Sequence, residues 1–160
     1  TFIQNYILLT FNFMDNTLLP DFLNFDIYKI SNNNDNIGII YNNDVRQTLI
    51  LINKPDETHL DFLSKILGAI QYDITKDVLL IAIEQKTQIN LTSILKNVDI
   101  AKVILFDIAP NDVGLNCRLP NYFPLEINER SFLLADSLSQ ISKNKVKKKD
   151  LWIALQKMFL

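Results

Sequence analysis

Three short, continuously apolar runs recur along the middle of the chain, and they constrain its fold more than any other feature. The runs are TLILI at residues 48–52, VLLIAI at residues 78–83 and KVILFDI at residues 102–108. Runs of this kind are typical of strands that are buried on both faces of a sheet. The segments between them, residues 58–70 and 91–98, place apolar residues at helical spacing. Strands that alternate with helices predict βαβ crossovers and a parallel sheet covered by helices.

The chain extends this pattern at both ends. IGIIY at residues 37–41 predicts an edge strand, and residues 122–127 predict a fourth strand of the main sheet. Residues 132–141 and 145–160 each carry an apolar stripe and predict two C-terminal helices. We therefore expect residues 37–160 to form a single α/β domain. Its expected architecture is three-layer α/β/α, with a mainly parallel sheet of about four strands and a C-terminal helical pair.

Two local expectations accompany this fold. Asp56 or Thr58 is expected to be the N-cap of the first long helix, because short polar side chains satisfy the free amides there. Trp152 is expected to pack onto the body of the domain and to hold the last helix beside residues 132–141.

The composition is that of a globular protein. Of 160 residues, 48% are hydrophobic and 21% are charged, which excludes wholesale disorder. The single cysteine excludes an internal disulfide and favours a reducing compartment, so we expect a cytoplasmic location. No apolar run reaches the length of about 18 residues that a membrane span needs. Met14, followed by DNTLLPDF, looks like a more natural first residue of the protein than Thr1. We therefore expect residues 1–13 to be sequence upstream of the natural start.

A cluster of lysines lies near the C-terminus of an otherwise acidic chain. The net charge is −2, but without the five lysines at 143, 145, 147, 148 and 149 it is −7, with 11 basic and 18 acidic residues. Most of the surface should repel nucleic acid, so direct nucleic-acid contact is expected to be weak or absent. The cluster is either a solvated helix-joining face or a local anionic contact. The contact residues would be Lys145, Lys147, Lys148 and Lys149.

Few residues offer catalytic chemistry. The loops after the three runs contain no glycine-rich phosphate motif. Asp107 and Asp112 form a candidate acid–base pair, although such residues more often close turns or cap helices. His59 is the only histidine, which argues against a zinc site, and we expect it on the solvated side of a helix. Cys117 has no histidine nearby in sequence and is expected to be an idle thiol. We therefore predict no catalytic residue, metal or cofactor.

Residues 1–36 are interpreted as an extension ahead of the domain. Residues 18–28, LLPDFLNFDIY, combine apolar and acidic side chains and are followed by the polar linker SNNNDN at residues 31–36. One interpretation is a docking peptide for another protein, since aromatic anchors dominate many interfaces. The alternative is that the segment packs on its own domain as an edge strand or short helix. The candidate anchors are Leu18, Leu19, Phe22, Phe25 and Tyr28.

Two stretches resemble a known family. QTLILINKPDETHLDFLSKILGAIQYDITKDVLLI combines a strand, a loop, a helix ending L-x-K-I-L-x-A-I and a second strand. ADSLSQISKNKVKKKDLWIALQKMF contains small-D-x-L, a basic linker and L-W-x-x-L. Together, over about residues 46–83 and 134–159, they resemble the psi subunit of bacterial DNA polymerase III, a small α/β accessory protein of the clamp loader. The resemblance implies a non-enzymatic adaptor that contacts clamp-loader subunits through a flexible N-terminal peptide.

The first of these stretches also resembles the opening of the uracil-DNA glycosylase fold. That resemblance implies an alternative function, an enzyme or degenerate enzyme with a nucleotide- or base-binding pocket at the carboxyl ends of the strands. The loop NKPDE has no glycine and no histidine follows His59, so the resemblance assigns no catalytic residue. Clustering of Asp107, Asp112 and Asn116 in a deep cleft would favour this alternative.

Overall fold

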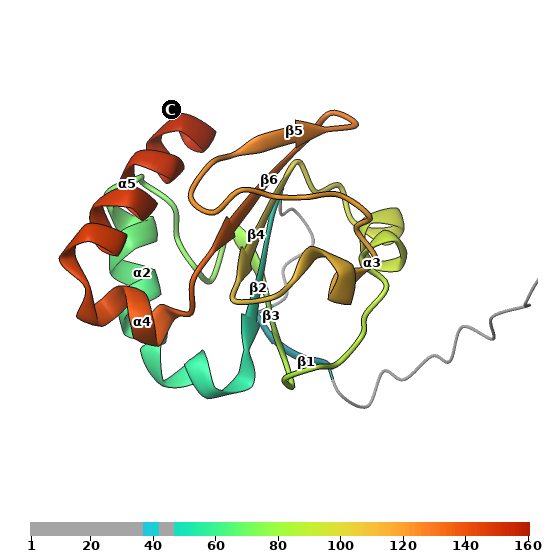
Figure 1. Ribbon diagram of the computed structural model, residues 1–160, viewed down its shortest axis with the longest axis horizontal. Coiled ribbons are helices and arrows are strands. Elements are labelled where there is room, and N and C mark those ends of the chain that lie inside the picture. Colours follow the sequence, from blue (N-terminus) through green and yellow to red (C-terminus); the bar gives the residue numbers. More distant parts are fainter. Residues whose placement is uncertain (1–36, 42–46) are drawn as a thin grey trace, which may run out of the picture. The chain divides into compact units, whose positions relative to one another are not determined.

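The computed structural model of the chain describes residues 37–41 and 47–160, which belong to one compact unit (Figure 1). Within this part, the strands form one six-stranded sheet in the order β1-β3-β2-β4-β6-β5. Strands β3, β2, β4 and β6 are parallel to one another, and the two edge strands, β1 and β5, are antiparallel to their neighbours. The expected mainly parallel sheet is confirmed. The strands are β1 (Ile37–Tyr41), β2 (Thr48–Asn53), β3 (Val78–Ile83), β4 (Lys102–Phe106), β5 (Leu125–Ile127) and β6 (Arg130–Ala135).

Helices cover both faces of this sheet, which confirms the three-layer α/β/α architecture. Helices α2, α4 and α5 lie against one face, and α3 lies against the other (Figure 1). The last two helices form a C-terminal pair as expected, although the first of them begins at Leu138 and not at Phe132. The α-helices are α2 (Leu60–Ala69), α3 (Leu91–Asn97), α4 (Leu138–Lys143) and α5 (Lys145–Phe159), and the 3₁₀ segments are η2 (Lys54–His59) and η3 (Pro110–Val113).

The apolar runs form the centre of the sheet, as predicted. Every residue of β2 and β3 is buried. In β2, Ile50 and Ile52 face the cluster beneath α2, α4 and α5, whereas Leu49 and Leu51 face the cluster on the α3 side. Each central strand therefore contributes to two apolar cores, which explains why its sequence is continuously hydrophobic rather than alternating.

The helix predicted over residues 132–141 is wrong. This segment is the end of strand β6, a turn at Asp136 and Ser137, and the short helix α4. Strand β6 pairs in parallel with β4, and its Phe132 and Leu133 enter the cores on opposite faces of the sheet. The free edge of β4 gains a hydrogen-bonded partner in this way, which an isolated helix would not provide.

The fourth parallel strand is consequently β6. The strand predicted over residues 122–127 is the shorter strand β5, which is antiparallel to its neighbour. Strand β5 is the antiparallel edge of a hairpin with β6, with Ile127 opposite Arg130. Asn128 and Glu129 form its two-residue loop with φ angles of 48° and 64°. Two positive φ angles give such a loop the twist that matches its strands.

The expected N-cap of the first long helix is also wrong. The 3₁₀ segment η2 intervenes, and α2 begins only at Leu60. Thr58 Oγ donates to the carbonyl of Pro55. Asp56 is buried and caps a different helix: its carboxylate accepts hydrogen bonds from the amides of Leu138 (2.8 Å) and Ser139 (3.2 Å) at the start of α4.

Helix α5 lies on the body of the domain as expected, through Leu151, Ala154, Leu155 and Met158. Trp152 is half-buried and packs against the same cluster, which confirms its contact with the body. Helix α5 also lies beside residues 132–141 as expected, although these residues form the end of β6 and the start of α4. Among the described helices, none is both long and apolar enough to cross a membrane.

Candidate functional site

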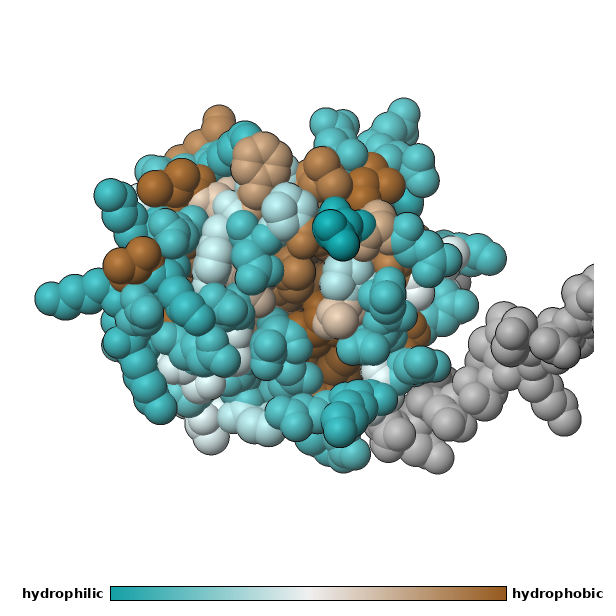
Figure 2. Space-filling model, viewed as in Figure 1, coloured by the Kyte–Doolittle hydropathy of each residue, from teal (hydrophilic) through white to brown (hydrophobic). Residues whose placement is uncertain are grey.

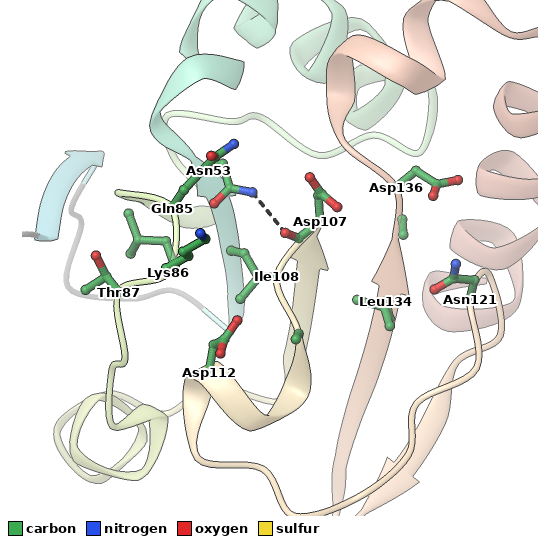
Figure 3. A pocket seen from close by; sticks show the side chains of 13 residues that line it. Asn53, Gln85, Lys86, Thr87, Asp107, Ile108, Asp112, Asn121, Leu134 and Asp136 are labelled. Carbon is green, nitrogen blue, oxygen red and sulfur yellow. Dashed lines mark hydrogen bonds between the residues drawn. The ribbon is translucent and has the colours of Figure 1, made fainter.

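A cavity of about 410 Å³ lies at the carboxyl ends of the parallel strands (Figure 3). The chain proceeds from β2 to β3 on one side and later returns to β4 on the other side of β2. The gap between the ends of β2 and β4 is therefore the switch point at which open α/β sheets bind ligands. Asn53 ends β2 and Asp107 follows β4, so both line the cavity at this point.

Asn53 joins the two strand ends directly. Its side chain is 7% exposed, and Nδ2 donates a 2.9 Å hydrogen bond to the backbone carbonyl of Asp107. Asp107 has a φ of 54°, and Lys86, which also lines the cavity, has a φ of 64°. Left-handed backbone is strained for residues other than glycine and persists only where the surroundings hold it. Two residues of the cavity lining thus have a backbone conformation that is unfavourable for residues other than glycine.

Carboxylates determine the electrostatics of the cavity. Figure 3 shows the Asp107 side chain between Asn53 and Asp136. Partial burial raises the pKa of Asp107, and the negative charges of Asp56 and Asp136 raise it further, against the opposing effect of Lys147. An acid with a raised pKa is suited to proton exchange. It would still need a reacting partner, and neither His59 nor Cys117 lines this cavity.

The other carboxylate at this edge, Asp136, has two intramolecular partners. The Tyr122 hydroxyl donates to Asp136 Oδ2 at 2.5 Å, and Lys147 Nζ lies 2.9 Å from the same oxygen. Burial opposes ionisation of Asp136, but these two donors outweigh it and lower its pKa. Burial and the hydrogen bond to Asp136 together raise the pKa of Tyr122. The network joins the loop before β5, the end of β6 and the first turn of α5, so Asp136 is a structural acceptor.

Removing the Tyr122 hydroxyl should weaken this network. We expect Tyr122→Phe to lower the free energy of unfolding by about 1–2 kcal/mol at neutral pH, since a hydrogen bond to a charged group is lost and the ring is kept. The pKa of Asp136 should rise in the variant. Because the folded-state pKa of Asp136 lies below its ordinary value of 3.8, its contribution is present above that pH and is lost as the pH falls through the folded pKa. Urea unfolding at neutral and acidic pH measures both effects.

Tyr72→Phe is the matched control for that experiment. The Tyr72 ring contacts Phe159 edge-on, and its hydroxyl makes no hydrogen bond among the described residues. The Tyr72→Phe substitution should leave the free energy of unfolding nearly unchanged at either pH. An equal loss in Tyr72→Phe and Tyr122→Phe, or a Tyr122→Phe loss that does not shrink in acid, would contradict the role given to Asp136.

The structure brings together only some of the predicted chemical residues. Asp107 and Asp112 line the same cavity, as the base-binding alternative requires, but Asn116 lines a separate groove with Cys117. His59 lies at the start of α2, outside the cavity, with Nδ1 3.0 Å from Thr58 Oγ. It is half-buried rather than on the solvated side of a helix. Cys117 is half-buried against the core on the α3 side.

The lysine cluster is on the first turns of α5. Lys147 is bound to Asp136, and Lys148 Nζ lies 5.5 Å from the ring centre of Phe62. Lys145 and Lys149 are exposed and have no ion pair within the described part of the chain. An anionic contact by this cluster stays a prediction, and these two lysines are the most available for it.

The predictions from sequence do not include Asn53 and Asp136, which line the cavity, or Tyr122, which donates to Asp136. Two of the three carry a usable signal, because Asn53 comes directly after the apolar run TLILI and Asp136 directly follows β6. Tyr122 carries none. The candidate docking residues lie outside the described residues, so their role stays a prediction; they are Leu18, Leu19, Phe22, Phe25 and Tyr28.

The described residues contain no group of three or more His, Cys, Asp or Glu side chains that could hold a metal ion. Comparison of the chain with protein-family models, with curated proteins and with solved structures finds no match.

Proposed function

We propose that this protein is a non-enzymatic accessory protein that acts through protein–protein contacts, as the psi subunit of the DNA polymerase III clamp loader does. The supporting observation is that the two stretches that resemble psi pack together. Leu63 and Leu67 of α2 share one apolar cluster with Leu151 and Leu155 of α5, although the stretches are far apart in sequence.

The placement of the reactive side chains supports a role without catalysis. His59 and Cys117 lie outside the cavity that Asp107 and Asp112 line. A nucleophilic mechanism needs its nucleophile and its base within hydrogen-bonding reach of each other, and at this cavity only the two carboxylates share a site. We propose that the contacts are made in the cytoplasm, with clamp-loader subunits as partners and residues 18–28 as the docking element.

The first test is truncation. The full chain, mixed with purified clamp-loader subunits from the same organism, should co-elute with them in size-exclusion chromatography. The chain lacking residues 1–30 should remain folded and elute alone. The acidic Asp21 and Asp26 imply a basic rim on the partner, so added salt should weaken binding through a slower association rate. A full chain that binds no clamp-loader subunit, or a folded truncated chain that keeps every partner, would overturn the assignment.

The matched control addresses enzyme activity. The triple variant His59→Ala, Asp107→Ala, Cys117→Ala should keep clamp-loader binding and support the same cellular function as the parent. Loss of cellular function in a folded triple variant that still binds its partners would favour the enzyme alternative. If the truncated chain unfolds instead, residues 1–30 are part of the domain core and not a docking peptide.

A further inference from the structure

Helix α5 carries apolar residues on its outer face as well as on the face it buries. Val146 is 66% exposed, Ile153 is 50% exposed and Leu160, directly after the helix, is 86% exposed. These residues, which we call the outer stripe, are seven positions apart. Seven residues are about two helical turns, so the stripe lies along one side of the helix. Figure 2 shows apolar patches on the α5 side of the domain, each surrounded by polar surface.

The outer side of α5 is mixed, because Lys149 and Asp150 lie between Val146 and Ile153. Exposed apolar side chains that alternate with lysines are suited to a partner that offers both apolar groups and negative charge. Phe123, which is 48% exposed, extends the apolar surface beside the helix, and Lys157 Nζ lies 3.7 Å from its ring centre. The outer stripe and Phe123 thus form one candidate contact surface.

The charges next to the outer stripe are mainly positive. Lys149 lies one turn before Ile153 and Lys157 lies one turn after it, and Lys145 is adjacent to Val146. Asp150 is the acidic residue of this helix and is half-buried. Two such surfaces facing each other would place lysines opposite lysines, which disfavours a second copy of this chain as the occupant. A nucleic acid would bind the lysines but would leave Val146 and Ile153 without apolar partners.

We propose that the outer face of α5 binds an acidic amphipathic helix of a partner protein. Val146 and Ile153 pack between apolar residues that recur at intervals of three and four on the partner helix, and Lys145 and Lys149 pair with carboxylates beside them. This contact is separate from the one proposed for residues 18–28, and each can fail without the other.

Site-specific photocrosslinking in the native cell tests the contact. A photoreactive amino acid replaces Ile153 in the full chain, and in a control it replaces Lys96, which is exposed on α3 on the other face of the sheet. Mass spectrometry identifies the crosslinked segment. The expected result is an acidic segment of another protein, with apolar residues at helical spacing, found at position 153 and not at 96; a crosslink to residues 18–28 of the chain itself would overturn the proposal. A crosslink to a second copy, to nucleic acid or to a non-acidic segment, or no crosslink specific to 153, would overturn the proposal.

The identified segment, made as a synthetic peptide, then gives the affinity. Ile153→Glu and Val146→Glu should each weaken binding at least about tenfold. Lys149→Glu should weaken binding too and should be rescued by a peptide with its facing carboxylate changed to lysine. Lys96→Glu should change nothing. The substituted positions are exposed, so thermal melts should match the parent, and unchanged affinity in folded Ile153→Glu would refute the proposal. The chain lacking residues 1–30 should still bind this peptide with the affinity of the full chain. Failure of this proposal and failure of the clamp-loader assignment can therefore be told apart.

Discussion

Leu151→Ala is expected to lower the free energy of unfolding by about 3 kcal/mol, measured by equilibrium urea denaturation. Leu151 is fully buried between α5 and the sheet, in the same cluster as α2 and α4. Truncation of a buried leucine removes its transfer free energy and leaves a cavity, which together cost roughly 2–5 kcal/mol. That loss is a large share of the roughly 5–15 kcal/mol by which an ordinary domain is stable.

Ile153→Ala is the matched control on the same helix. Ile153 is half-exposed on the opposite side of α5, so its truncation should change stability by no more than about 0.5 kcal/mol. The two variants therefore separate the face that holds the fold from the face available to a partner. Similar losses in both would mean that Ile153 is covered within the chain, and the interaction surface proposed for α5 would then be lost.

The central strands were predictable from sequence because tertiary structure imposes one simple demand on them. A parallel strand covered on both faces is apolar at nearly every position. Residues 48–52 and 78–83 show this pattern in their local sequence, so no information about neighbouring strands is needed to predict them. The helix α5 was predictable for a similar reason, since Leu151, Leu155 and Met158 mark one buried face.

The helix predicted over residues 132–141 is wrong because the spacing of its apolar residues fits two different structures. Leu134, Leu138 and Ile141 are separated by four and three positions, as on one side of a helix. In the structure, Leu134 lies on β6 and packs on the α3 side of the sheet, whereas Leu138 and Ile141 lie on α4 on the other side. Pairing with β4 decides between the two structures, and that pairing is a long-range property.

The same error hid part of the candidate site. The apolar run KVILFDI marks Asp107 as a residue at the end of a strand, whereas the helical spacing of residues 132–141 conceals that Asp136 follows one. Asn53 begins the polar stretch NKPDE, which predicts a loop, although its backbone ends β2. The contact between Tyr122 and Asp136 depends on how the loop before β5 crosses the end of β6, which no local pattern determines.

Asp56→Ala should also cost about 3 kcal/mol, although Asp56 looks like an ordinary loop residue in the sequence. Asp56 is 3% exposed, and its carboxylate accepts hydrogen bonds from the amides of Leu138 and Ser139, more than eighty residues away. Those amides begin α4 and have no partner within the helix. A hydrogen bond to a charged acceptor contributes about 1.5–3 kcal/mol, and a buried donor left unsatisfied carries a penalty of similar size.

Two companion variants give this prediction its specificity. Asp61→Ala removes an exposed acid from the first turn of α2 and should cost about 0.5 kcal/mol or less. Asp56→Asn keeps one acceptor oxygen but loses the charge, so its cost should fall between the other two. Hydrogen exchange at the amides of Leu138 and Ser139 should accelerate in Asp56→Ala more than exchange in β2 and β3, because the start of α4 loses its cap before the sheet opens. Unchanged protection of those two amides would show that Ser137, which also caps α4 through Gln140, is sufficient to hold the helix without Asp56.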